Sequence, residues 1–94
     1  MIARKATIRN EYGIHCRPSA IIVQELKDYP GTIRVRDASG QEADAKHLLE
    51  LISLGLRCGA EIEIEVDGPD EEAMAEKAAE LFERHFEFVP RDKA

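Results

Sequence analysis

The sequence predicts an α+β open-faced sandwich, with a four-stranded antiparallel sheet and three helices on one face in the order βαββαβα. Polar and apolar residues alternate in short segments, most regularly in "AEIEIEV" (60–66). Other segments carry apolar residues at helical spacing. Because strands of this kind bury one side only, the helices are expected to cover a single face of the sheet.

The chain opens with a strand and a helix. Residues 2–9 place Ile2, Ala6 and Ile8 on one side, which is typical of a half-buried strand. A helix is predicted from residue 16 or 17 to residue 28, ended by "YPG". Pro18 falls in its first turn, where the missing N–H costs nothing.

The middle of the chain predicts a hairpin and a short helix. "TIRVRD" (32–37) alternates, "ASGQ" is typical of a turn, and residues 41–44 form a short polar strand. Residues 46–53 then have apolar positions at helical spacing, with Gly55 as the stop signal.

The strand at 60–66 faces its glutamates outward, so the open face of the sheet must be wet. "DGPDEEAMAEKAAELFERHF" (67–86) predicts the last helix, with acids at its positive end. Its apolar stripe consists of Met74, Ala78, Leu81, Phe82 and His85. We expect one domain over residues 1–94, with a core at about 3–86 and a loosely held tail at 87–94.

The composition of the chain limits the classes of protein to which it can belong. The chain has 94 residues, 44% hydrophobic and 34% charged, and no apolar run that approaches the roughly 20 residues of a membrane crossing. The first residues lack the features of a secretory signal, so we expect a cytoplasmic monomer without membrane insertion. Its two cysteines, Cys16 and Cys58, are expected to be free thiols.

Charge is distributed unevenly along the chain. Residues 1–36 carry seven Lys/Arg against three Asp/Glu, whereas residues 61–83 carry ten Asp/Glu against one lysine. The basic half favours an acidic macromolecular partner, although a solvated helix face also explains the acidic half. A net charge of -6 and only 5% aromatic residues disfavour binding to nucleic acid.

"GIHCRPSA" (13–20) places three chemically capable side chains at the start of the first helix. The unpaired first-turn amides and the positive end of the helix favour an anion there. Because Pro18 has no N–H, the nearby donors are the backbone amides of Cys16, Arg17 and Ser19. The same positive end favours an unprotonated, nucleophilic ring nitrogen on His15. Arg17 adds a permanent cation suited to phosphate, so the motif predicts a phosphoryl-accepting site.

The motif resembles the active-site signature of the HPr family, the histidine-containing phosphocarriers of the bacterial phosphoenolpyruvate-dependent sugar phosphotransferase system (PTS). The similarity also covers "ADAKHLLELISLGLRCGAEIEI" and "GPDEEAMAEKAAELF". It implies that His15 accepts a phosphoryl group on Nδ1 from phosphorylated enzyme I and passes it to a histidine of an EIIA protein. Arg17 would stabilise that group, and no metal or cofactor is implied. The implied partner-docking residues are Ala20, Gln24, Lys27, Lys46, Leu48, Leu49 and Ile52.

Two positions depart from the family pattern. Cys16 replaces a smaller residue; its thiol could block His15 when oxidised, but a tolerated side chain is the favoured interpretation. His47 occupies the position at which many relatives carry a regulatory serine, so we expect this chain to lack the serine switch. Neither a zinc site from His15, Cys16 and His47 nor a Cys16–His15 hydrolase pair matches a common motif.

Three functions remain open from the sequence. The first is a phosphocarrier of sugar uptake, a stoichiometric carrier that is not itself an enzyme. The second is a regulatory, nitrogen-type carrier of the same family that moves no sugar. The third is a small ferredoxin-like binding module, which failure of His15 to accept a phosphoryl group would favour.

Overall fold

The computed structural model describes residues 1–10, 14 and 16–84, with only the backbone of residue 16. His15, the Cys16 thiol, His85 and the predicted tail 87–94 lie outside the described part. The elements are β1 (Ile2–Thr7), α1 (Cys16–Leu26), β2 (Thr32–Asp37), β3 (Glu42–Asp44), α2 (Leu48–Ser53), β4 (Glu61–Asp67) and α3 (Glu71–Glu83). This is the predicted order of strands and helices.

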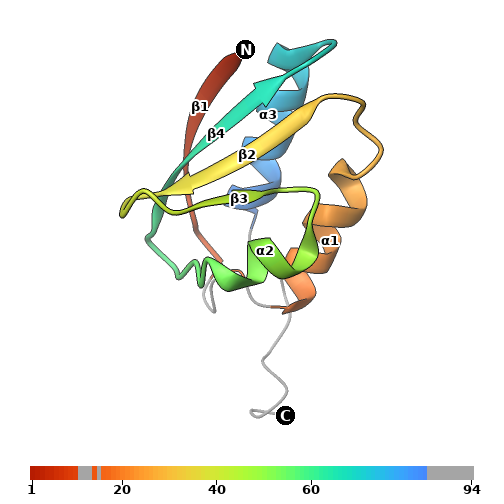
Figure 1. Cartoon of the computed structure of the whole chain (residues 1–94). Coiled ribbons are helices and arrows are strands. Elements are labelled where there is room, and N and C mark those ends of the chain that lie inside the picture. The colour runs from red at the N-terminus through yellow and green to blue at the C-terminus, as the bar shows by residue number, and fades with distance from the viewer. Residues whose placement is uncertain (11–13, 15, 85–94) are drawn as a thin grey trace.

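The four strands form one antiparallel sheet in the order β1-β4-β2-β3 (Figure 1). The strand with the most regular alternation, β4, lies inside the sheet and pairs on both sides, with β1 and with β2. Its three apolar side chains, Ile62, Ile64 and Val66, are buried. The open-faced sandwich predicted from the alternation is therefore confirmed.

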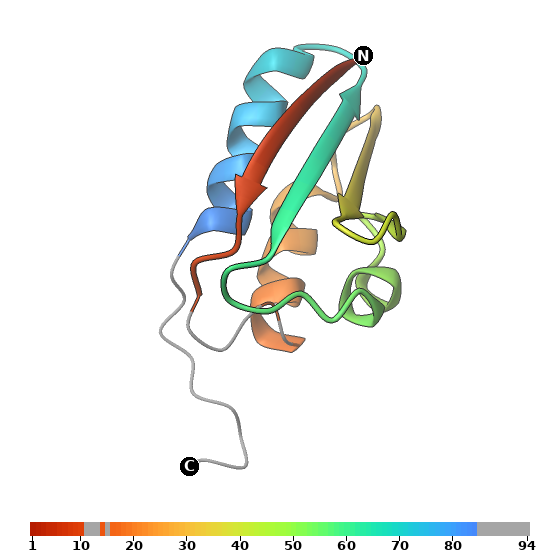
Figure 2. The same cartoon turned by 90° about the vertical axis from the view of Figure 1, so that its left-hand side faces the viewer.

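The helices cover one face of this sheet. α3 packs on β1 and β4, α1 contacts both other helices, and α2 follows β3 at the lower end of the view (Figures 1 and 2). Among the described residues, no helix has the length and apolar character needed to cross a membrane. The largest buried side chains include Ile22 and Leu26 of α1, Leu51 of α2, and Leu81 and Phe82 of α3.

The buried face of α3 differs slightly from the predicted stripe. Ala75 and Ala78 are fully buried, whereas Met74 is only half-buried and packs at the margin of the core. A helix that presents alanines to a sheet can approach it closely. The larger apolar side chain of Met74 therefore lies at the edge of the contact between α3 and the sheet, and not at its centre.

On the opposite face of the sheet, arginine and glutamate side chains form a network of ion pairs. Arg36 on β2 contacts Glu63 at 3.1 Å and Glu65 at 3.3 Å on β4, and Glu42 on β3 at 3.4 Å. Arg34 contacts the same Glu42 at 3.1 Å. This network explains how a face rich in glutamates can stay open to solvent, because the arginines on β2 offset the repulsion between the glutamates.

Candidate functional site

The start of α1 is fixed by a backbone contact to the loop after α2. Ile14 is buried, and its N–H donates to the carbonyl oxygen of Leu56 at 2.9 Å. Pro18 is also buried in the first turn of α1. Since His15 follows Ile14 directly in the chain, this contact holds the segment that leads to the predicted phosphoryl acceptor.

The first turn of α1 differs in charge from the first turns of the other two helices. The first turn of α2 contains Glu50 and that of α3 contains Glu71 and Glu72, whereas the first turn of α1 contains none. It contains Arg17 instead, which is exposed. A helix N-terminus with this composition favours an external anion, because no carboxylate of its own offsets the helix dipole.

Four exposed residues form a stripe along α1 that begins at Arg17. Ala20, Gln24 and Lys27 are all exposed, and the spacings of three, four and three residues place them on one side of the helix. Lys27 follows the last residue of α1, where its N–H still donates to the carbonyl oxygen of Val23 at 2.8 Å. The structure thus brings four of the predicted site residues onto one surface.

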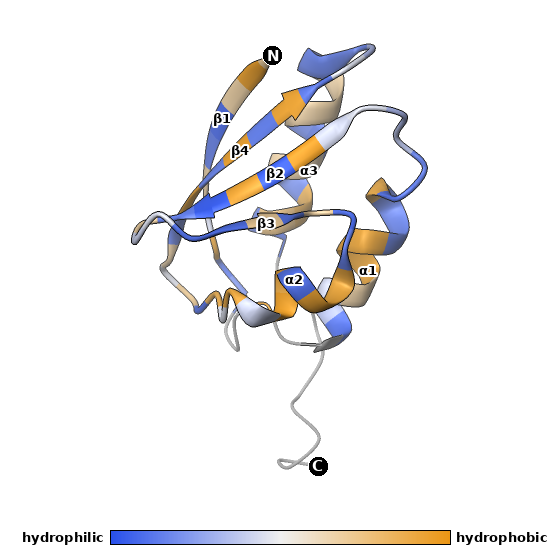
Figure 3. Ribbon diagram, in the orientation of Figure 1, coloured by the Kyte–Doolittle hydropathy of each residue, from blue (hydrophilic) through white to orange (hydrophobic). Residues whose placement is uncertain are grey.

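α2, which contacts α1, adds an apolar patch to this end of the molecule (Figure 3). Leu48 is 37% exposed and Leu49 is 71% exposed, while Ile52 is half-buried and Leu51 is buried. Leu48 and Leu49 therefore both face outward, although the helix that carries them is short. Large exposed apolar side chains next to a cationic stripe are typical of a surface that docks a protein.

Lys46 differs from the other predicted docking residues in the contacts of its side chain. Its ammonium donates to the carbonyl oxygens of Tyr29 at 2.9 Å and of Gly31 at 2.6 Å, and the residue is half-buried. Lys46 also precedes α2 and is not its first residue. Its ammonium therefore holds the loop between α1 and β2, and the docking role of Lys46 stays a prediction.

His47 is the N-cap of α2. Its Nδ1 accepts a hydrogen bond from the N–H of Glu50 at 3.4 Å, and the Glu50 carboxylate lies 4.0 Å from the same nitrogen. An N-cap side chain satisfies an amide that has no partner within the helix. His47 therefore helps to start the helix that carries the exposed leucines.

Ser19 is a buried polar residue that sequence reasoning did not single out. It is fully buried in α1, and its hydroxyl finds no hydrogen-bond partner among the described residues. Nothing in the sequence around Ser19 indicates whether its hydroxyl is buried or exposed. Burying a hydroxyl without a partner costs stability.

Replacing Ser19 by alanine is therefore expected to stabilise the protein by about 1 kcal/mol, since it removes an unpaired group and improves helix propensity. The measurement is the free energy of unfolding in urea. Ser53→Ala is the control, because the Ser53 hydroxyl donates to the carbonyl oxygen of Glu50 at 2.7 Å and should not be stabilised by its loss. A loss of stability in Ser19→Ala would show that the hydroxyl has a partner in solution.

No group of three or more His, Cys, Asp or Glu side chains suited to a metal ion is found among the residues described. Cys58 is a free, exposed thiol, as expected.

Comparison with known proteins identifies the family. The model named "PTS HPr component phosphorylation site" matches residues 2–84. The chain belongs to the HPr family. It is a phosphocarrier protein of the HPr/NPr type, and the open-faced sandwich is the fold that this family shares.

Individual relatives agree with this assignment. The chain is 34% identical to the phosphocarrier protein HPr of Treponema pallidum over 93% of its own length and 98% of the relative's. It is 30% identical to the phosphocarrier protein NPr of Proteus mirabilis, over 89% of this chain and 93% of that one. The crystal structure of HPr from Bacillus anthracis matches with a TM-score of 0.81 at 26% identity, over 87% and 96% of the two chains.

HPr-like sequence also occurs within longer proteins. A multiphosphoryl transfer protein of Vibrio cholerae is 40% identical to this chain over 70% of the chain's length. The matched region makes up only 17% of that longer protein.

Proposed function

We propose that this chain carries a phosphoryl group from phosphorylated enzyme I to an EIIA protein in PTS sugar uptake, with His15 as the carrier residue. The observation that carries the proposal is the composition of the first turn of α1. The helix follows the anchored Ile14, has Arg17 in its first turn and has no acid there. A phosphoryl group bound at the start of α1 meets amide donors and a guanidinium, which is the electrostatic setting its charge requires.

Each transfer exchanges one P–N bond for another. The bond between phosphorus and the donor histidine breaks as a bond between phosphorus and Nδ1 of His15 forms. In the second transfer the bond between phosphorus and Nδ1 of His15 breaks as a bond to the EIIA histidine forms, which leaves His15 free to accept again. Positioning and charge stabilisation supply most of the catalysis in phosphoryl transfer. Arg17 and the backbone amides of Cys16 and Arg17 would offset the charge of the transferred group while it changes partner.

The docking surface in this proposal consists of Arg17, Ala20, Gln24 and Lys27 from α1 with Leu48, Leu49 and Ile52 from α2. The carrier meets its partners in succession through one surface, which suits a monomer that acts in the cytoplasm. His47 provides no hydroxyl at the position of the regulatory serine, so phosphorylation there by the serine kinase is not expected.

A nitrogen-type regulatory role is the second candidate. The similarity to NPr of Proteus mirabilis favours it, as does the resemblance of "GPDEEAMAEKAAELF" to that branch. The chemistry at His15 would be the same in both roles. The difference lies in which enzyme I supplies the phosphoryl group and which protein receives it.

The test is the intact mass of the protein after incubation with phosphoenolpyruvate and enzyme I. We expect the native chain to gain one acid-labile phosphoryl group and His15→Ala to gain none. A gain by His15→Ala would place the acceptor elsewhere, and no gain by either protein would contradict the carrier function. The reaction is then repeated with an enzyme I of the nitrogen branch. The enzyme I of the branch in which this chain acts should phosphorylate it at a lower carrier concentration than the other enzyme I does, which separates the two roles.

A further inference from the structure

Asn10 is a buried polar residue that has no part in the chemistry or the docking proposed above. With Ser19 and Tyr29, it is one of three buried residues in the described part of the chain whose side chain is polar. The hydroxyl of Ser19 finds no hydrogen-bond partner there, whereas Asn10 does form an interaction. Burying an amide costs free energy unless it is hydrogen-bonded, so a buried asparagine with a partner fixes the chain around it.

Asn10 lies near the beginning of the connection from β1 to α1, residues 8–15. Two residues before it, the N–H of Ile8 donates to the carbonyl oxygen of Ala60 at 2.8 Å. The carbonyl oxygen of Ile8 accepts from the N–H of Gly59 at 2.7 Å. Both partners belong to the loop between α2 and β4. The beginning of the connection is therefore fastened to this loop.

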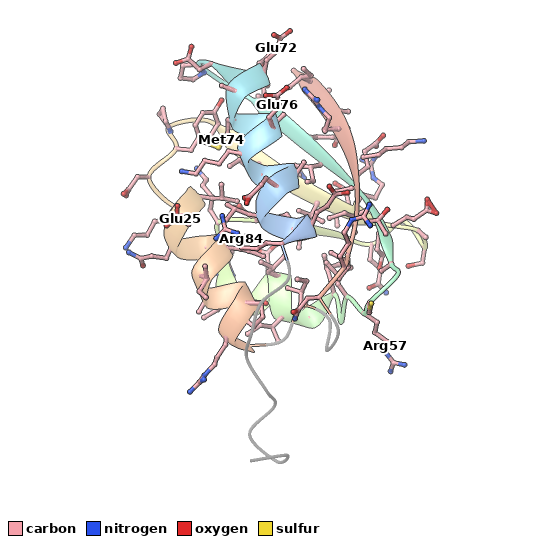
Figure 4. The ribbon with its side chains drawn as sticks, turned by 180° about the vertical axis from the view of Figure 1, so that it is seen from behind. Glu25, Arg57, Glu72, Met74, Glu76 and Arg84 are labelled. Carbon is pink, nitrogen blue, oxygen red and sulfur yellow. The ribbon has the colours of Figure 1, made fainter. Side chains whose placement is uncertain are left out.

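The end of the connection is fastened to the same loop, by the hydrogen bond from Ile14 to Leu56. Figure 4 shows the side chain of Arg57, next in this loop, directed away from the body of the molecule, so the loop meets the connection through its backbone. Asn10 thus lies between two fixed points, and His15 comes directly after the second of them. Asparagine side chains characteristically bond backbone groups of the loop in which they lie.

We infer that Asn10 is a positioning residue for phosphoryl transfer, whose buried amide holds the connection from β1 to α1 so that Nδ1 of His15 is presented to the phosphorus atom. This inference rests on the proposed function and adds a residue that touches neither the phosphoryl group nor the partner. Transfer needs the reacting atoms about 3–3.5 Å apart, and a misplacement of about 1 Å can cost about 100-fold in rate. Loss of the amide should therefore slow the transfer step and leave the binding of enzyme I unchanged.

The experiment mixes enzyme I, already phosphorylated by phosphoenolpyruvate, with increasing concentrations of the carrier and follows phosphoryl gain in a single turnover. Asn10→Leu keeps a side chain of similar size but removes the amide. We expect it to lower the maximal rate of transfer at least about ten-fold and to change the half-saturating carrier concentration less than about two-fold. If Asn10→Leu does not fold, Asn10→Ala takes its place, because it removes the amide without adding a side chain that has to pack.

Asn10→Asp tests whether the hydrogen bonding of the amide is responsible. It keeps the shape of the side chain and a hydrogen-bond acceptor, so it should retain at least about a third of the native maximal rate. A role in packing alone would not separate the aspartate from the leucine in this way.

Ile33→Val is the matched control for a loss of stability alone. Ile33 is fully buried on β2 in the row of the sheet that contains Val66 and Ile2, at the other end of β1 from Ile8. The shorter side chain weakens the core away from the connection to α1. The unfolding temperature of every variant is measured, and transfer is compared where all are folded. Ile33→Val should keep its maximal rate within about two-fold of the native rate.

Three results would overturn the inference: a maximal rate of Asn10→Leu within about two-fold of the native rate, an equal fall in Ile33→Val, or no higher rate in Asn10→Asp than in Asn10→Leu. A rise in the half-saturating concentration at an unchanged maximal rate would do so as well, because it would place the effect on partner binding. Absence of phosphoryl gain by the native chain would overturn the proposed function together with this inference. Equal transfer to the native chain and to Asn10→Leu would overturn the role of Asn10 alone.

Discussion

Gly31→Ala is expected to lower the free energy of unfolding by at least about 3 kcal/mol, because an added Cβ has no space at this position. It would collide with the carbonyl oxygen of Asp67, and would lie 2.7 Å from Cε2 of Tyr29 and 2.9 Å from the Cα of Gly68. Two of these three neighbours are backbone atoms, one in the last residue of β4 and one in the turn that follows it. They cannot rotate away as a flexible side chain would.

The ring of Tyr29 cannot give way easily either. Its hydroxyl donates to the carbonyl oxygen of Pro69 at 2.8 Å, and the residue is buried in the core cluster. Gly68, opposite, is equally restricted, since a Cβ there would lie 2.7 Å from the Tyr29 hydroxyl. Two glycines and one tyrosine thus form a packed corner between the loop before β2 and the turn before α3.

Thermal and urea unfolding measure the effect of Gly31→Ala, with a fall in Tm of more than about 12 °C expected for a domain of this size. Gly40→Ala is the control. Gly40 has a φ of 93° but open space around the added Cβ, so its replacement introduces backbone strain of about 1–2 kcal/mol without a collision. Equal losses in the two variants would mean that the corner relaxes around the methyl group.

The fold was predictable because its signals are local. β4 alternates residue by residue, and each apolar side chain on it is buried as the period of two requires. The packed corner was not predictable, because "YPG" indicates only the end of a helix. That Gly31 must face Gly68 depends on the pairing of β2 with β4, which brings together residues far apart in the sequence.

The same distinction applies to the candidate site. The position of Arg17 and the exposed stripe from Ala20 to Lys27 follow from the start of one helix and its spacing of 3.6 residues. The side-chain contacts of Lys46 cross from the β3–α2 turn to the α1–β2 loop. No local sequence pattern contains these contacts, and the resemblance to the family indicated only a docking role for Lys46.

Lys46→Met is expected to lower the free energy of unfolding by about 2 kcal/mol, because it leaves two partly buried carbonyl oxygens without the charged donor that satisfies both. Methionine keeps the length and apolar character of the side chain, so packing changes little. Urea unfolding measures this loss. Lys27→Met is the control, since it removes the same charge from an exposed lysine whose ammonium forms no contact with a described residue.

The two lysines should also differ in phosphoryl transfer from enzyme I. Lys27 is expected to act through its charge, so Lys27→Met should raise the KM for the carrier at low salt and lose this effect at high salt. Lys46 holds the loop immediately before α2, the helix with Leu48 and Leu49, so any effect of Lys46→Met on KM should persist at high salt. Unchanged stability together with a salt-sensitive rise in KM would return Lys46 to the docking surface, because it would show that the ammonium leaves the carbonyls of Tyr29 and Gly31 to meet the partner.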